Sequence, residues 1–331
     1  MPAAPAPSLS AAVAPGAGPA PTIAAVARGV LATQYERMRA HAPGVLQDRD
    51  PDHVHDMRVA IRRARCALRL FEAPLDAAAC RHVRRELSWL AGLLGGVRDM
   101  DVMLTHLKQQ YKVVAADKKS RDALRACCLA ARVPAFVRMQ DGMLSARYAC
   151  TLKALAALLP VQPADAACPP AALEGARILR TLIKRTLKAV PACATSGALH
   201  GMRIQCKKLR YACEFLGPHV GDAVRELVKP LVAVQDCLGR HQDAQVTQAF
   251  LRHCANVLAQ RGELAPEPLL MIGALLHCER TVAAARCAAF DDLSAAFVRQ
   301  ATRLRTWLGE RIEQAHAPAP PGAAPADTPA P

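Results

Sequence analysis

The chain has 331 residues, enough for one large domain or two small ones, and its 52% hydrophobic content supplies the side chains of a sizeable core. Lys and Arg number 43 against 28 Asp and Glu, which gives a net charge of +15. A surplus of this size repels itself in a compact state and indicates a polyanionic partner, such as nucleic acid, an anionic membrane or polyphosphate. An aromatic content of only 4% argues against single-stranded nucleic acid, whose bases stack on aromatic rings.

The cysteines are 13 in number, and none forms a Cys-x-x-Cys motif. Many occupy apolar positions, so we expect reduced thiols that serve as small hydrophobic side chains, a cytoplasmic location and no metal site. Uninterrupted apolar runs are too short to cross a bilayer. Residues 1–27 contain no basic side chain, and we therefore predict neither a membrane span nor a secretory signal.

The ends of the chain are rich in Pro and Ala, which predicts disordered tails over residues 1–21 and 317–331 and a folded region over 22–316. Ala, Leu and Arg favour helix, and no segment alternates as a strand does, so we predict an all-α fold. The first half is expected over residues 22–159. Its predicted helices cover 22–41 (ended by Pro43-Gly44), 51–73, 77–94 (ended by Gly95-Gly96), a segment from 97 past 107, 120–132 and 134–159.

A Pro-rich stretch at residues 160–170 is the only internal sequence with linker character, and it marks the predicted boundary between the halves. The second half, residues 171–316, has the same order of features. Its predicted helices cover 171–189, a segment ending at Gly217-Pro218, 222–238 (closed by Gly239), and segments beginning at Gln242, Pro266 and Asp291. We interpret the recurrence as an internal duplication of two similar helical-bundle halves, six helices each, related by a pseudo-twofold axis.

The strongest feature is a basic amphipathic helix that occurs once in each half. Apolar residues recur every three or four positions, and the residue after nearly every one is basic. These cations are His55, Arg58, Arg62, Arg63, Arg65 and Arg69 in the first half, and His200, Arg203, Lys207, Lys208 and Arg210 in the second. Their head groups are expected about 5–6 Å apart along each helix, a spacing that suits a chain of phosphates. The alternative is a solvated face whose Lys and Arg stems cover the edge of the core.

Three acidic residues follow the basic helices at similar places. Asp99 and Asp243 each lie at a predicted helix start, where the helix dipole favours a carboxylate, and Asp101 lies close to Asp99. We expect all three to support the structure by holding Arg or His side chains. Asp99 with Asp101 also suggests Mg²⁺, but Gln245 replaces the second carboxylate in the second half, and we predict no metal.

The segments His55-x-x-Arg58-x-x-x-Arg62-Arg63-x-Arg65 and Leu94-Gly95-x-x-Arg98-Asp99-x-Asp101-Val102, with their second copies, resemble the CHAD domain, the conserved histidine α-helical domain. The resemblance covers roughly residues 22–316. It implies two bundle-like halves about a pseudo-twofold axis, binding of inorganic polyphosphate through a basic surface, and association with polyphosphate granules in bacteria. The ligand set it implies is His55, Arg58, Arg62, Arg63 and Arg65 with His200, Arg203, Lys207, Lys208 and Arg210. Gln242 departs from the pattern, because it stands where the first half has Arg98.

Catalytic motifs are absent from the sequence, including phosphate-binding Gly-rich loops, His-Glu-x-x-His and the Glu-x-Glu-x-Lys strand of the triphosphate-hydrolysing CYTH domain. We therefore predict a polyphosphate-binding module that is not an enzyme and needs no cofactor. Three alternatives stay open: a nucleic-acid-binding protein that uses the same surface, a Mg²⁺-dependent enzyme acting on phosphate chains through Asp99 and Asp101, and a subunit interface. The sequence leaves the oligomeric state undecided.

Overall fold

The computed structural model describes residues 20–190, 195–260 and 266–316, and within them the predicted all-α fold is confirmed. The two predicted tails fall almost wholly outside these residues. The helices are α1 (Ile23–Gln47), α2 (Pro51–Leu70), α3 (Ala77–Val113), α4 (Lys118–Leu144), α5 (Ala146–Ala156), the 3₁₀ helix η1 (Pro163–Ala167), α6 (Ala171–Lys188), α7 (Ser196–Val220), α8 (Ala223–Gln260) and α9 (Pro266–Gln314).

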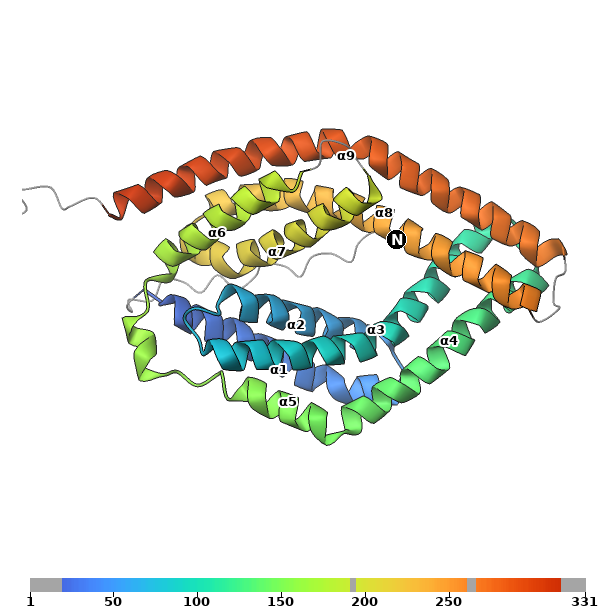
Figure 1. Ribbon diagram of the computed structural model, residues 1–331, viewed down its shortest axis with the longest axis horizontal. Coiled ribbons are helices and arrows are strands. Elements are labelled where there is room, and N and C mark those ends of the chain that lie inside the picture. Colours follow the sequence, from blue (N-terminus) through green and yellow to red (C-terminus); the bar gives the residue numbers. More distant parts are fainter. Residues whose placement is uncertain (1–19, 191–194, 261–265, 317–331) are drawn as a thin grey trace, which may run out of the picture.

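Two groups of helices lie one above the other in Figure 1, the first built from α1, α2, α3 and α5 and the second from α6 to α9. Their buried side chains form one continuous core, and the groups meet where α1 contacts α6 and α2 contacts α7. The residues that lead into α1 and α6 also pair reciprocally: Ile23 N donates to Pro169 O at 3.0 Å, and Ala171 N donates to Pro21 O at 2.9 Å. A twofold relation would produce this reciprocity, and the internal duplication itself stays a prediction.

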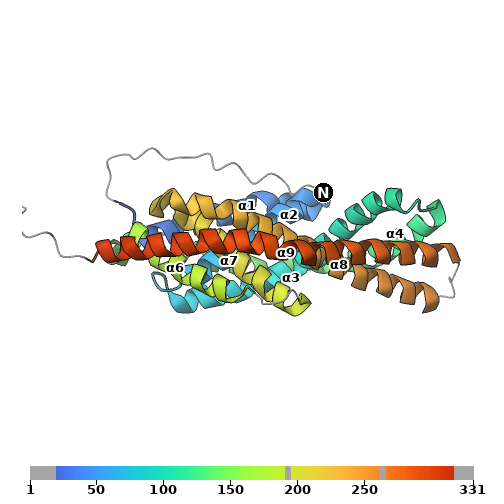
Figure 2. The same cartoon turned by 90° about the horizontal axis from the view of Figure 1, so that it is seen from above.

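One end each of α3, α4, α8 and α9 projects from the bundles, and together these ends form an arm at one end of the molecule, seen on the right in Figure 2. A second, smaller core fills the arm, with Leu107 of α3 and Leu124 of α4 packed in one cluster with Leu251 of α8 and Leu275 of α9. The arm therefore ties the first half of the chain to the second at a distance from the bundle core.

Glycine does not end the helices where the sequence predicts. α3 passes through Gly95-Gly96 and α8 passes through Gly239, so the predicted helix starts near residues 97 and 242 are wrong. Gly95 serves close packing instead, since a Cβ there would lie 2.8 Å from Arg58 Nη1. Asp99 and Asp243 consequently lie within helices, and the helix-start argument made for them is wrong.

Proline is also accommodated inside helices. Pro43 is exposed within α1 and Pro134 is exposed within α4, while the nearby Val45 and Ala135 are buried and hold each helix on the core. α9 likewise runs without a break past the predicted start at Asp291. Because of these continuations, the described residues contain five α-helices before the boundary and four after it, and the prediction of six in each half is wrong.

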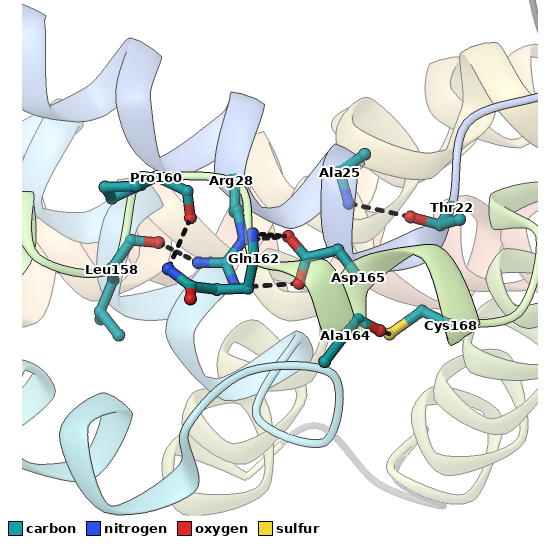
Figure 3. Close-up of polar contacts among 9 residues, drawn as sticks. All are labelled: Thr22, Ala25, Arg28, Leu158, Pro160, Gln162, Ala164, Asp165 and Cys168. Atoms are coloured by element: carbon teal, nitrogen blue, oxygen red, sulfur yellow. Dashed lines mark hydrogen bonds and ion pairs between the residues drawn. The ribbon is translucent and has the colours of Figure 1, made fainter.

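The predicted linker at 160–170 is anchored to α1 by a buried ion pair (Figure 3). Arg28 Nε and Nη2 donate to the two carboxylate oxygens of Asp165 at 2.5 and 2.9 Å, and Nη1 donates to Leu158 O at 2.5 Å. Gln162 N also donates to Asp165 Oδ2 at 3.0 Å. These bonds lower the pKa of the Asp165 carboxyl, with the Arg28 contact contributing most.

α9 contains one stretch that is long and apolar enough, by length and composition alone, to cross a membrane. This helix packs along α8 and α6, and 33% of the apolar window is buried inside the structure. A core helix of a soluble protein passes the same test, so the stretch is weak evidence for a span.

A candidate anion-binding surface on two basic helices

Local sequence sets the orientation of α2. The Asp50 side chain accepts from Asp52 N at 2.8 Å, and Pro51 occupies the first turn, where no intrahelical N–H is required. Val54, Met57 and Ile61 are then buried on one stripe. His55, Arg58 and Arg62 follow these residues by one position and so lie beside the core at its edge.

α7 repeats this arrangement with Leu199, Met202, Cys206 and Leu209 buried and Arg203 and Lys207 half-buried beside them. The two basic helices contact each other at the junction of the bundles, as Figure 1 shows. The junction therefore brings cations from sequence-distant helices together.

Arg62 of α2 and Arg203 and Lys207 of α7 lie close enough to affect one another's charge. Burial first, and then the positive charges of Arg203, Arg62 and Arg58, together lower the pKa of Lys207 to about 8 against the opposing effect of Asp243. Burial and Arg62 likewise lower the pKa of Arg203, and burial, Arg62 and Arg98 lower that of Arg58. We call Arg58, Arg62, Arg98, Arg203 and Lys207 the central cluster.

Carboxylates neutralise the central cluster only in part. Asp99 Oδ1 lies 3.6 Å from Arg58 Nη2, and Asp243 acts on Arg203 and Lys207 from the second half. Arg62 Nε donates at 2.5 Å to the hydroxyl of Tyr211 and not to a carboxylate. Five cations therefore face two carboxylates, an arrangement that favours binding of an external anion.

The two predicted histidines differ in environment. His55 is half-buried, and burial followed by Arg98 lowers its pKa against the opposing effect of Asp56; the lowered pKa favours the neutral ring. His200 is exposed, with Nδ1 3.2 Å from Gln242 Oε1. Arg98, which corresponds to Gln242, donates instead to Pro51 O at 3.4 Å. The two halves thus differ at the position where their sequences differ.

Arg63 and Arg210 share one acid, Glu214, which offsets one of their two positive charges. Arg63 forms an ion pair with Glu214 and lies over the Phe215 ring with Cζ 5.0 Å from its centroid. Arg210 Nε donates to Glu214 Oε1 at 2.9 Å, and its Nη1 donates to Gln235 at 3.3 Å. These contacts hold α7 to α2 and α8, and the role of the two residues as polyphosphate ligands stays a prediction.

Arg65, Arg69 and Lys208 lie on another part of the surface. Burial followed by Arg69 and Arg84 lowers the pKa of Arg65, and burial followed by Arg69 and Arg185 lowers that of Lys208. The charges with the largest effect on Lys207 are instead Arg203, Arg62, Asp243 and Arg58. The structure thus divides the predicted Arg and Lys ligands into a central cluster, a pair that shares Glu214 and a second basic group.

Asp101 lies outside the central cluster. Its Oδ1 accepts from Arg132 Nε at 2.6 Å, and Arg132 also forms a two-pronged contact with Asp48 at 2.6 and 2.9 Å. This network ties α3 and α4 to the turn after α1. Across the described ranges, His, Cys, Asp and Glu nowhere gather in a group of three that could hold a metal ion.

Sequence reasoning missed Tyr211, Arg98 and Glu214 as parts of this surface. Arg98 was visible in the motif after the basic helix, and Tyr211 directly follows Arg210. Glu214 lies one helical turn after Arg210, the spacing at which opposite charges pair on a helix. From that spacing the Arg210–Glu214 ion pair could have been predicted.

The fold and these side chains define an all-helical domain with a strongly basic surface between two bundles. The family model of the CHAD domain matches residues 29–252, and the chain belongs to the CHAD domain family. This family is associated with polyphosphate and triphosphate binding in general.

Solved structures agree with this assignment. The crystal structure of the CHAD domain from the plant Ricinus communis superimposes with a TM-score of 0.68 at 27% identity, covering 84% of this chain and 92% of that one. PptA from Streptomyces chartreusis has a TM-score of 0.67 at 21% identity, covers 83% of this chain and 99% of its own, and is similar in fold. Uncharacterised proteins from two strains of Mycobacterium tuberculosis are 28% identical over 226 residues, 64% of this chain; the chain spans 42% of their length.

Proposed function

We propose that this protein binds inorganic polyphosphate through the central cluster, without catalysing a reaction on it. The observation that carries the proposal is the meeting of Arg58 and Arg62 with Arg203 and Lys207 across the junction of α2 and α7. The cations repel one another in the free protein, and a chain with one negative charge per phosphate relieves that repulsion. Arg guanidinium groups match phosphate oxygens in pairs.

The mechanism is exchange of counterions. Cations of the central cluster replace the small ions that surround the polyanion, so the affinity falls steeply as salt concentration rises. Binding also draws protons onto the site near pH 8, because a nearby phosphate raises the pKa of Lys207 from about 8. Because the pKa of His55 is also lowered in the free protein, this residue takes up a proton on phosphate binding in the same way, at a lower pH than Lys207.

The test is a charge-reversed variant in which Arg58, Arg62, Arg203 and Lys207 all become Glu. Titrated with long-chain polyphosphate at low salt, it should lose binding while its far-ultraviolet circular dichroism stays helical. The matched control reverses Lys118, Lys119, Arg121 and Arg125, which are exposed on α4, and so changes the net charge equally. Equal loss of affinity in both variants, or no loss in the first, would contradict the proposed site.

Nucleic acid is the second candidate, favoured by the net charge of +15. We expect DNA at equal phosphate concentration to displace polyphosphate poorly, because the scarcity of aromatic side chains leaves bases little to stack on. Efficient displacement by DNA would favour nucleic acid as the ligand.

The proposal extends to the reaction and the location. Incubation of the protein with Mg²⁺ and long-chain polyphosphate should release no phosphate, and release would favour the alternative of an enzyme using Asp99 and Asp101.

We also propose a cytoplasmic location on polyphosphate granules. A fluorescent fusion expressed in polyphosphate-accumulating bacteria should mark the granules, and the charge-reversed fusion should be diffuse.

A further inference from the structure

A pocket of about 300 Å³ lies between α2, α6 and α7, at the second basic group. Its walls include the cations Arg69 of α2, Arg185 of α6 and Lys208 of α7. This volume is at the lower end of the range for small-molecule sites. Along α2, Arg69 of the pocket follows Arg62 of the central cluster by seven residues, which is about two helical turns.

The charge of this pocket is not balanced by the protein. Within the described part of the chain, Arg69, Arg185 and Lys208 form no ion pair or hydrogen bond. Arg177, a fourth cation of the wall, is paired with Glu174 at 3.2 Å. Three cations thus share one small space with no acid of their own, which favours an anion carrying at least two charges.

Apolar side chains form the rest of the wall. Leu70, Ile178 and Leu182 line the pocket beside the three cations. A bare phosphate chain gains nothing from such surface, whereas an organic group buried there gains about 25 cal/mol for each Å² of apolar area. The wall therefore distinguishes this pocket from the central cluster by chemistry as well as by position.

We propose that this pocket is a second binding site, specific for a small organic phosphate. The phosphoryl group lies among Arg69, Arg185 and Lys208, and the apolar or aromatic body of the ligand packs against Leu70, Ile178 and Leu182. The site is independent of polyphosphate binding by the central cluster.

The experiment compares 1-naphthyl phosphate with inorganic phosphate by isothermal titration calorimetry of the full chain. The naphthyl ester should bind at least tenfold more tightly. Arg185→Glu should weaken it at least tenfold, and Thr181→Trp, which fills the pocket without changing the charge, should abolish it. The control Lys184→Glu alters a neighbouring exposed cation outside the pocket and should leave binding unchanged.

Equal affinity for the two phosphates, or naphthyl phosphate binding that survives Arg185→Glu, would overturn the proposal. Arg185 is exposed, so this variant keeps the test valid if the Trp variant fails to fold. The charge-reversed central variant should still bind naphthyl phosphate. Failure of polyphosphate binding is therefore distinguishable from failure of this site.

Discussion

Lys207 is the residue at which binding and stability are expected to oppose each other. Its pKa falls from the ordinary 10.5 to about 8 in the folded protein, chiefly through burial and then through Arg203 and Arg62. A shift of this size corresponds to a penalty of about 3 kcal/mol on the folded state while Lys207 is charged. Lys207→Met keeps the length of the side chain and removes the charge, so it should raise the free energy of unfolding at pH 7 by up to about 3 kcal/mol.

The pH dependence follows from the same values. Between pH 8 and 10.5 the unfolded chain holds the Lys207 proton and the folded chain does not, so wild-type stability rises with pH in this window. The advantage of Lys207→Met should therefore be full below pH 8 and disappear near pH 10.5. Urea unfolding followed by circular dichroism at pH 7 and pH 10 measures the full advantage and its decline, with exposed Lys184→Met as the control.

The same variant should bind polyphosphate more weakly than the wild type at pH 7. In calorimetry at pH 8.5, wild-type binding should take up protons, so its heat should depend on the ionisation enthalpy of the buffer, and that dependence should shrink in Lys207→Met. An unchanged or lower urea midpoint at pH 7 would refute the reasoning, because it would mean that Lys207 carries no penalty of burial and repulsion.

Other substitutions test the remaining contacts. Gly239→Ala places no atom within 4 Å of the new Cβ and should stabilise α8 by about 0.5–1 kcal/mol. Gly95→Ala displaces the Arg58 guanidinium, so it should stabilise the protein less and should reduce its affinity for polyphosphate. Equal polyphosphate affinity of the two variants would contradict the placement of Arg58. Asp165→Asn leaves the Arg28 charge buried and should cost about 3–5 kcal/mol in urea unfolding at pH 7. The pKa of Asp165 lies below its ordinary 3.8 in the folded chain, so its stabilisation is present above pH 3.8 and is lost as the pH falls. The free energy of unfolding of the variant should therefore fall less steeply with decreasing pH than that of the wild type. Equal slopes for the two proteins would exclude this ion pair as a cause of acid destabilisation. Glu214→Gln removes the partner of Arg63 and Arg210 and should destabilise the protein by about 2–3 kcal/mol without weakening polyphosphate binding; weaker binding would mean that the pair orders the site.

Helix content was predictable from sequence, but helix ends were not. The recurrence of apolar residues every three or four positions requires helices wherever a core forms, and it placed α2 and α7 well. Gly95 and Pro134 are local signals for an end, each worth a few kcal/mol at most, and packing overrides them. α3 continues through Gly95 because Arg58 of another helix occupies the space beside it, a contact that no local pattern contains.

By itself the sequence determined the charge, the two basic helices and their buried stripes, because these follow from composition and period alone. Only the tertiary structure decided the use of each cation. Arg62 and Arg63 are neighbours in the chain, yet one faces Arg203 and Lys207 while the other pairs with Glu214. Adjacent helical positions point about 100° apart, so the crossing of α2 and α7 determines which charge meets an acid and which is left for a ligand.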